Sequence, residues 1–287
     1  MNLSIIIPTF QNFKYLTLCI SSLKKNSTFN HQIIVHLNGK DNNSEKFMND
    51  NGIAYTKSTN NIGLCSGVNL ASKQAVKDYI LYAHDDMYFL PKWDFYLKEE
   101  INKYNHNKFY LSITQISHSG AVKGDLQHIQ FNCGENLDNF NEKKLLDNYE
   151  NFEFRDLQGS HWAPHLIHKS LWKTIGGFSE EFDPGFASDP DLNMKLWKEG
   201  VRIFKGVSKS RVYHFGSLTA RKNKDVAKNN GKKTFFLKWK ISVEFFTKYY
   251  LRRGSTFDGP LNEPKKNLFY YFDLIICKLK YFKIKFF

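Results

Sequence analysis

The chain has little cysteine and no long apolar run. Its 287 residues include four cysteines, Cys19, Cys65, Cys133 and Cys277, which are too widely spaced to form a Cys-x-x-Cys metal pair. This spacing argues against a disulfide scaffold or a structural zinc site, and it predicts reduced, mostly buried thiols in a cytoplasmic protein. No run of roughly 18 apolar residues predicts a membrane span, and the N-terminus lacks the pattern of a signal peptide.

Acidic residues are scarce in the last third of the chain. Residues 201–287 hold 21 Lys and Arg against 5 Asp and Glu, a balance of +16, whereas the first 200 residues hold 20 against 23, a balance of −3. The net charge of +13 therefore belongs almost entirely to the last third. Such a segment is either a solvated face or a surface for an anionic partner, which is a membrane or a nucleic acid.

The first hundred residues alternate apolar runs with segments of helical spacing. Buried strands are expected at residues 3–7, 33–36, 53–56 and 79–83, and helices at 13–23 and 60–75. This order predicts an α/β fold of the Rossmann-like kind, with a mostly parallel sheet flanked by helices. A strand at 109–116 and a helix at 190–199 follow, while the polar stretch at 120–149 carries no clear pattern.

A Lys- and Asn-rich stretch at residues 221–231 predicts the boundary between two parts of the chain. Residues 1–220 then form the α/β domain. Residues 221–287 form a basic, helical C-terminal extension, with helices expected at about 232–252 and 264–287.

Two adjacent carboxylates follow the apolar strand at 79–83, in the segment His84-Asp85-Asp86. Ligands of open α/β sheets bind at the carboxyl ends of the strands. Two charges so close repel each other unless a cation lies beside them, and oxygen ligands suit Mg²⁺ or Mn²⁺, which commonly hold phosphates. The alternative is that Asp85 and Asp86 cap a helix that begins near Pro91.

A second acidic cluster is Ser188-Asp189-Pro190-Asp191. Pro190 suits the first position of a helix, and the helix dipole favours both carboxylates, which is the role we prefer for Asp191. Asp189 is expected in the loop just before the helix, facing a cleft, where a carboxylate can act as a general base. His214 follows a strand-like segment and is either a metal ligand or a structural hydrogen-bond donor.

A glycine-spaced segment runs from Asn61 to Asn69. Gly63 permits a tight turn and Gly67 a close backbone approach. Free N–H groups at the start of the following helix are able to receive a phosphate. The alternative is a helix that packs tightly on the sheet.

These segments occur together in the order and spacing of one enzyme family. They are Ile5-Ile-Ile-Pro8-Thr9-Phe10, Asn61-x-Gly63 with Gly67 and Asn69, the run 79–86 with Pro91-Lys-Trp93, and Gly176-Gly177-Phe178 with Asp189-Pro190-Asp191-Leu192. Over roughly residues 1–220 the chain resembles family 2 glycosyltransferases of the GT-A fold.

The resemblance implies an inverting transfer from a nucleotide sugar whose diphosphate is bridged to the protein by Mn²⁺ or Mg²⁺. Asp86 matches the metal-coordinating Asp, and His214 resembles a late metal or diphosphate ligand. Asp85 is expected to contact ribose or metal, and Asp189 matches the base that deprotonates the acceptor hydroxyl. The other residues expected to bind the donor are Pro8, Thr9, Phe10, Asn38, Asn61, Gly63, Asn69 and Trp162.

The chain departs from the family pattern at several positions. His84 stands at the first Asp of the Asp-x-Asp motif, which weakens the usual ribose contact, and Ser188 replaces a Glu before the base. In the family, an Asp near the position of Asn38 contacts the nucleobase. An Asn at this position is able to hydrogen-bond uracil or thymine, so a UDP- or dTDP-type donor is expected. Trp162 either stacks on a sugar ring or belongs to an ordinary buried turn. Because no Gln-x-x-Arg-Trp sequence follows, a processive polysaccharide synthase is not expected.

The last helical segment places its apolar residues on one face. They are Leu268, Tyr271, Phe272, Ile275, Leu279, Phe282 and Phe286. Lys278 and Lys283 flank this face, so the helix is expected to lie peripherally at the inner face of the cell membrane, near lipid-linked acceptors. The alternative is packing on the catalytic domain or on the partner in a homodimer.

The predicted function is therefore a glycosyltransferase of polysaccharide biosynthesis that acts on a cell-surface glycan or a lipid-linked acceptor. Two other classes stay open: a catalytically degenerate binding module, because of His84 and Ser188, and a nucleic-acid-binding protein that uses the basic extension. A sugar-phosphate nucleotidyltransferase is disfavoured, since the first loop, Pro8-Thr-Phe-Gln-Asn, lacks a glycine-rich basic signature.

Overall fold

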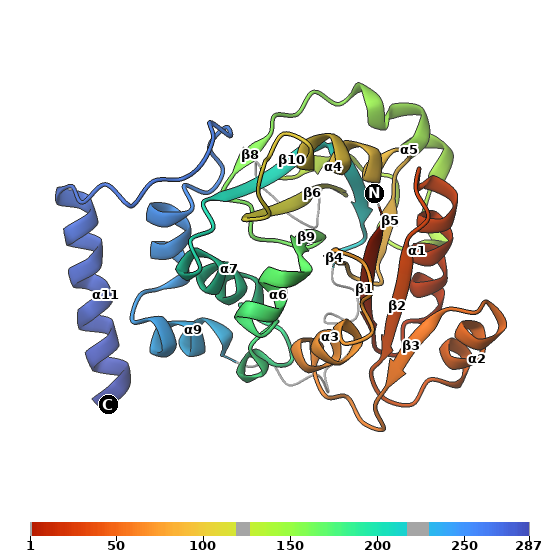
Figure 1. Ribbon diagram of the computed structural model, residues 1–287, viewed down its shortest axis with the longest axis horizontal. Helices are drawn as coiled ribbons and strands as arrows, with labels where there is room; N and C mark the ends of the chain where they lie inside the picture. The colour runs from red at the N-terminus through yellow and green to blue at the C-terminus, as the bar shows by residue number, and fades with distance from the viewer. Residues whose placement is uncertain (1, 119–126, 217–229, 287) are drawn as a thin grey trace.

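The computed structural model describes residues 2–118, 127–216 and 230–286 (Figure 1). The strands are β1 Leu3–Thr9, β2 Gln32–Leu37, β3 Ala54–Lys57, β4 Tyr79–Tyr82, β5 Met87–Phe89, β6 Phe109–Ser117, β7 Ile129–Gln130, β8 Leu157–Gln158, β9 His165–His168 and β10 Ile203–His214. The helices are α1 Phe13–Asn26, α2 Asn42–Asp50, α3 Leu64–Ser72, α4 Trp93–Ile101, α5 Glu142–Asn148, α6 Lys169–Ile175, α7 Ser188–Lys198, α9 Gly231–Trp239, α10 Val243–Phe245 and α11 Leu268–Phe286. Short 3-10 turns are η1 Leu137–Asn139, η2 Tyr149–Asn151 and η3 Glu180–Phe182, and η4 Phe246–Tyr250 is a π-helical turn.

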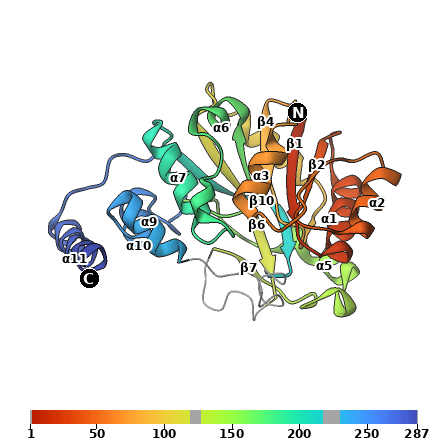
Figure 2. The ribbon, with the colours of Figure 1, turned by 90° about the horizontal axis from the view of Figure 1, so that it is seen from below.

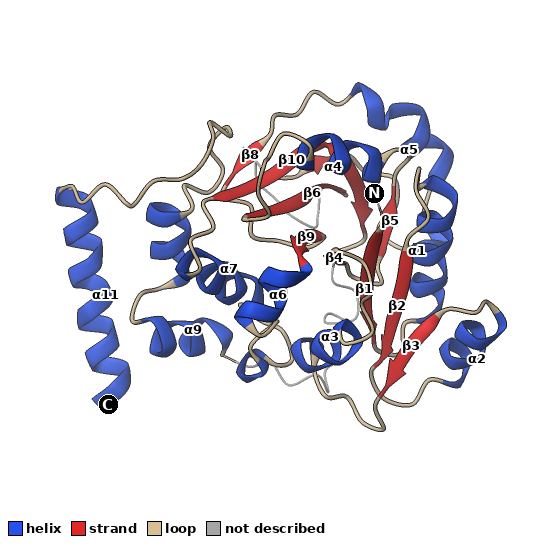
Figure 3. Ribbon diagram, viewed as in Figure 1, coloured by secondary structure: helices blue, strands red, loops and turns tan. Residues whose placement is uncertain are grey.

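Within these residues, one sheet follows the order β3-β2-β1-β4-β9-β6-β10-β5, with β7 beside β6 and β8 beside β10 (Figure 3). Strands β1 to β4 are mutually parallel where they pair, as are β6 and β10. Strands β9 and β5 run antiparallel to their neighbours. The predicted α/β class, with a mostly parallel sheet flanked by helices, is confirmed.

Local sequence explains the elements that carry the site. The side chains of Ile5, Ile6 and Ile7 in β1 are all fully buried, as expected for a central parallel strand covered on both faces. In α1, the buried side chains of Leu16 and Ile20 recur with helical spacing. Helix α1 contacts β5, α3 contacts β1 and β2, and α4 contacts β10.

Several predicted boundaries differ from the structure. Helix α3 begins only at Leu64, because Gly63 has a φ of 93° that a helix cannot contain. Helix α7 begins at Ser188, so Asp189 lies in its first turn rather than in the loop before it. The predicted helix at 232–252 is interrupted at Lys240, whose φ of 59° is left-handed. In the stretch 120–149 that carried no pattern, the described part contains β7, η1 and α5.

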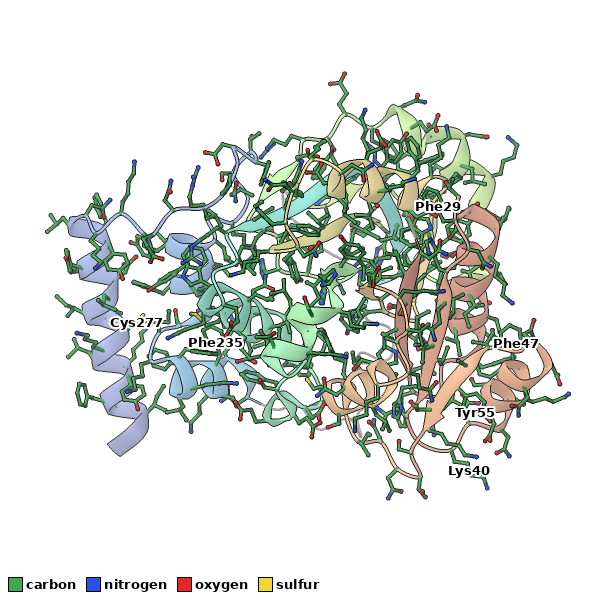
Figure 4. The ribbon with its side chains drawn as sticks, in the orientation of Figure 1. Phe29, Lys40, Phe47, Tyr55, Phe235 and Cys277 are labelled. Atoms are coloured by element: carbon green, nitrogen blue, oxygen red, sulfur yellow. The ribbon has the colours of Figure 1, made fainter. Side chains whose placement is uncertain are left out.

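The C-terminal extension forms a layer at one end of the molecule, opposite α2 (Figure 2). Phe235 of α9, Phe246, Leu251 and Leu261 belong to the same hydrophobic core as the sheet. Cys277 of α11 packs instead with a smaller outer cluster on α9 and α10 (Figure 4). The predicted linker at 221–231 lies outside the described residues, apart from its last two.

A buried carboxylate ties this extension to α7. Asp191 is fully buried and accepts hydrogen bonds from the Ser179 hydroxyl at 2.6 Å and the Trp239 indole N–H at 2.8 Å. Its Oδ1 also lies 2.9 Å from the Lys238 ammonium, which reaches Glu181 at 2.8 Å. Asp191 therefore joins α7 to α9, and its place in the first turn of α7 agrees with the structural role preferred for it.

We expect Asp191→Asn to lower the free energy of unfolding by roughly 2–3 kcal/mol, because it leaves buried donors and a cation without their charged acceptor. Urea unfolding followed by circular dichroism measures this change. Glu181→Gln is the matched control, since it removes the other, half-exposed carboxylate from Lys238 and should cost less than about 1 kcal/mol. An equal loss of unfolding free energy in the two variants would contradict the role of Asp191 in joining α7 to α9.

Candidate active site

The pairing of β5 with β10 brings together two parts of the candidate metal site. His214, the last residue of β10, pairs with Met87 of β5, and the N–H of Phe215 donates to the Asp86 carbonyl at 3.2 Å. As a result, Nε2 of His214 lies 3.2 Å from Oδ1 of Asp86. These two residues were predicted as metal ligands, and the structure places them side by side.

His84 completes a cluster with Asp86 and His214. One ligand atom from each residue lies within 4.8 Å of the others, and both Asp86 and His214 are buried. Burial lowers the pKa of His84 to about 4, so its ring is neutral and offers a lone pair at ordinary pH. The sequence comparison treated His84 as a departure from the family pattern, and the structure makes it a member of the cluster.

The hydrogen bonds of Gln115 identify one ring nitrogen of His214 as a proton donor. The side-chain Nε2 of Gln115 donates to the Ala163 carbonyl, so its Oε1 can only accept. That oxygen lies 2.9 Å from Nδ1 of His214, which must therefore carry the proton. Nε2 of His214 is then the ring nitrogen that faces the Asp86 carboxylate, and in the neutral tautomer with the proton on Nδ1 it presents a lone pair. Two facing acceptors of this kind fit a bound cation.

Asp85 points to a different partner. Its Oδ2 accepts a hydrogen bond of 2.6 Å from the Thr9 hydroxyl at the end of β1. Burial, followed by the neighbouring Asp86 charge, raises the pKa of Asp85 to about 7. Asp85 is not part of the ligand cluster in the described residues. Thr9 and Asp85, both predicted to contact the donor, therefore lie together beside the metal site.

Asp189 lies in the wall of a cavity of about 470 Å³. Burial raises the pKa of its carboxyl to about 7, while 26% of the side chain stays exposed. Its Oδ1 lies 3.8 Å from Nδ1 of His165, a fully enclosed imidazole whose pKa burial lowers to about 3. A carboxylate that is partly shielded, open to a cavity and poised near neutrality has the properties of a general base.

The start of α3 is not free to bind a phosphate. Asp183 accepts hydrogen bonds from the N–H groups of Cys65 at 2.7 Å and Ser66 at 3.2 Å, and from the Ser66 hydroxyl. A Cβ on Gly63 would lie 2.2 Å from the Asp183 carboxyl, so Gly63 permits this contact. The interpretation of these N–H groups as a phosphate site was wrong, because a carboxylate from a distant part of the chain already occupies them.

The three asparagines predicted to bind the donor make hydrogen bonds within the protein. Asn38 donates to the Gly63 carbonyl and accepts from the N–H of Ile62, and Asn61 accepts from the N–H of Gly63. Asn69 bonds both the N–H and the carbonyl of Phe178. These bonds shape the loop before α3 and its contact with the Gly176-Gly177-Phe178 segment; a donor-binding role for the asparagines stays a prediction.

The remaining predicted donor residues lie at two places. Pro8 precedes Thr9, the last residue of β1, and Phe10 follows, with its ring against Gly39. Trp162 is partly buried against β10 and β6, where its indole N–H donates to the Ile113 carbonyl at 3.2 Å. The structure therefore does not bring Trp162 to the end of β1.

Sequence reasoning missed four residues of this region: His84 as a candidate ligand, Gln115, His165 and Asp183. For His84 the signal was present, because imidazole is a metal ligand and the residue stands in a metal-binding motif. The other three act through contacts between distant segments, and no local pattern distinguishes them.

The chain belongs to glycosyl transferase family 2, whose model matches residues 4–172. This match confirms the predicted family and class of enzyme. No curated protein matches the chain.

Among solved structures the chain is similar to S. aureus TarS 1-349, with 17% identity, a TM-score of 0.55, and coverage of 75% of this chain and 60% of that one. It matches TarS 1-349 in complex with UDP at the same identity and TM-score, over 74% of this chain and 60% of that one. The complex with UDP-GlcNAc matches at 18% identity and a TM-score of 0.53, over 74% and 58%. The chain thus matches less than two thirds of the length of these proteins. At this sequence identity, the similarity shows the fold alone.

Among the helices that the structure describes, none is long and apolar enough to cross a membrane.

We expect the protein to bind Mn²⁺ and Asp86→Asn to abolish this binding, measured by electron paramagnetic resonance of free Mn²⁺. Gln115→Met, which removes the acceptor that orients His214, should weaken binding about 10–100-fold. Asp189→Asn is the control and should bind as the wild type does. Unchanged Mn²⁺ affinity in Asp86→Asn would exclude the cluster as a metal site.

Proposed function

We propose that the chain is an inverting, metal-dependent glycosyltransferase that moves a sugar from a nucleotide sugar to a hydroxyl group of a cell-surface glycan or lipid-linked acceptor. The observation that carries this proposal is the cluster of His84, Asp86 and His214 at the carboxyl end of β4 in a member of glycosyl transferase family 2. Residues 1–220 form the catalytic part in this proposal, and residues 221–287 the extension.

The cluster fits a divalent cation that would be held by His84, Asp86 and His214. Two imidazoles with one carboxylate favour a transition ion such as Mn²⁺ over Mg²⁺, which prefers oxygen ligands. When bound, the ion would neutralise the negative charge of the nucleoside diphosphate leaving group.

The donor is proposed to be a UDP- or dTDP-type nucleotide sugar. The existence of TarS complexes with UDP and UDP-GlcNAc supports a uridine nucleotide. In this chain, Pro8, Thr9 and Phe10 would line the nucleoside pocket, with Asp85 beside them to accept from ribose. Trp162 is less suited to stack on the sugar, because its indole is tied to the backbone of β6.

Asp189 is proposed as the base. It takes the proton of the acceptor hydroxyl as that oxygen bonds to the anomeric carbon and the bond from this carbon to the nucleoside diphosphate breaks. A single displacement from the opposite face inverts the anomeric carbon. The open side of the Asp189 carboxyl faces the cavity of about 470 Å³, which gives the acceptor a route to it.

We expect Asp189→Asn to lower the transfer rate about 100- to 10,000-fold while donor binding persists, because only proton removal is lost. Rapid-mix kinetics with a radiolabelled nucleotide sugar and Mn²⁺ measures transfer, and calorimetry measures donor binding. Asp191→Asn serves as a comparison at the next acidic position, and it should affect stability more than chemistry. Transfer by Asp189→Asn at the wild-type rate would remove Asp189 as the base.

We expect kcat/KM to rise with pH up to about 7 and then to level off, since Asp189 acts only in its deprotonated form and its pKa is about 7. Below that pH, the rate should fall about tenfold per unit as the carboxyl becomes protonated. The pKa of Asp85 is also about 7, so the profile is repeated with Asp85→Asn. Loss of the inflection in that variant would assign it to Asp85 instead.

We also propose that α11 attaches the enzyme to an anionic membrane surface. The apolar face predicted for it is exposed: 61% for Phe272, 66% for Leu279 and 83% for Leu268. The opposite face, with Tyr270 and Cys277, packs on α9 and α10. Exposed lysines of α11 beside an uncovered apolar stripe complement anionic lipid.

We expect the protein to sediment with vesicles made of phosphatidylcholine and phosphatidylglycerol in equal parts, and less with pure phosphatidylcholine. The double variant Phe272→Ser and Leu279→Ser should bind roughly tenfold or more weakly. Val76→Ser, which removes an exposed apolar side chain far from α11 in the sequence, is the control. A stable dimer that buries α11 and ignores vesicles would contradict membrane attachment.

A further inference from the structure

Two adjoining cavities form a groove between the candidate base and α11. The first, of about 470 Å³, has Asp189 in its wall and contains none of the metal-cluster residues among its lining. The second, of about 570 Å³, lies between α9 and α11. Asn230 and Lys232 line both, so the two cavities adjoin. We call the two cavities together the basic groove.

The far half of the basic groove concentrates positive charge. Lys232 and Lys233 of α9 and Lys280 and Lys283 of α11 line it, together with Glu244. Glu244 is already paired with Lys232 at 2.6 Å. In the part of the chain that the structure describes, no carboxylate lies within salt-bridge distance of Lys233, Lys280 or Lys283. Three lysines without a carboxylate partner in the described residues therefore line one cavity, an arrangement that favours a phosphate group.

The near half of the groove has a different chemistry. Phe186, with 42% of its surface exposed, and His161 stand in the wall beside Asp189. An aromatic ring next to a base is suited to the apolar face of a sugar ring. One extended molecule in the basic groove would thus meet the base and an aromatic ring at one end and ammonium groups at the other.

Helix α9, which lines both halves, is packed on the segment that carries Asp189. Gly231, the first residue of α9, packs closely on Phe186, which lies just before α7. A Cβ on Gly231 would lie 1.9 Å from the Phe186 carbonyl oxygen. Trp239, at the other end of α9, donates to Asp191 in the helix that carries Asp189. The lysines of α9 therefore keep a defined position relative to the base.

We infer that the basic groove binds a phosphate-bearing acceptor. Its sugar hydroxyl lies at Asp189 beside Phe186, and its phosphate lies among Lys233, Lys280 and Lys283. This inference rests on the transferase function proposed above and narrows its acceptor to the class of phosphate esters. A lipid-linked sugar phosphate and a soluble phosphate-containing polymer share this chemistry.

The test compares two double variants of the full chain that lose the same charge. Lys280→Gln with Lys283→Gln removes two ammonium groups from the groove, and Lys265→Gln with Lys266→Gln removes two exposed ones just before α11. Calorimetry with inorganic tripolyphosphate in EDTA, which keeps divalent metal out, measures binding. The groove variant should bind roughly tenfold more weakly and the control as the wild type does. Equal weakening, or none, would overturn the inference.

Two further arms separate the source of the phosphate and the proposed function. Detergent micelles with polyprenyl phosphate should displace tripolyphosphate if the acceptor is lipid-linked, whereas micelles without it should not; no displacement by either indicates a soluble acceptor. UDP binding in the presence of Mn²⁺ should be the same in the wild type and in the groove variant. Absence of binding by both UDP and dTDP in the wild type would count against the proposed transferase, whereas the tripolyphosphate comparison alone tests phosphate binding in the basic groove.

Discussion

The short antiparallel pairing of β5 with β10 is the constraint on which the candidate metal site depends. It is only three residue pairs long, and it places His214 opposite Met87 and therefore beside Asp86. Since side chains alternate between the two faces of a strand, a slip of one residue would turn His214 to the other face. The register of one edge strand thus decides whether the candidate ligands lie side by side.

Burial changes the pKa values of two carboxyl groups of the candidate site. Asp85 and Asp189 both have pKa values raised to about 7 because they are shielded from water. Because these pKa values are raised in the folded chain, the protonated carboxyl groups contribute to the free energy of unfolding at low pH. This contribution is lost as the pH rises through 7. For Asp189 the same shift would supply the proposed base with a suitable strength.

The sequence predicted the elements whose cause is local. The apolar run of β1, the helical spacing of α1 and the strand before His84 follow from composition and periodicity, and each is present in the structure. The expected phosphate site at α3 failed because Asp183, far along the chain, bonds its N–H groups. Gln115 was missed for the same physical reason: its role depends on the strand pairing that brings it to His214.

The contacts of the C-terminal extension change the interpretation of this segment. From sequence, residues 221–287 are a basic appendage whose charge has either no partner or an anionic one. In the structure, Lys238 forms an ion pair with Asp191 and Trp239 donates a hydrogen bond to it, two residues from Asp189. Phe235 belongs to the hydrophobic core of the sheet. A displacement of α9 must therefore strain α7, the helix that carries Asp189. A segment attached in this way is able to position an acceptor, because the surface that would hold the substrate and the carboxylate that would deprotonate it belong to one packed unit.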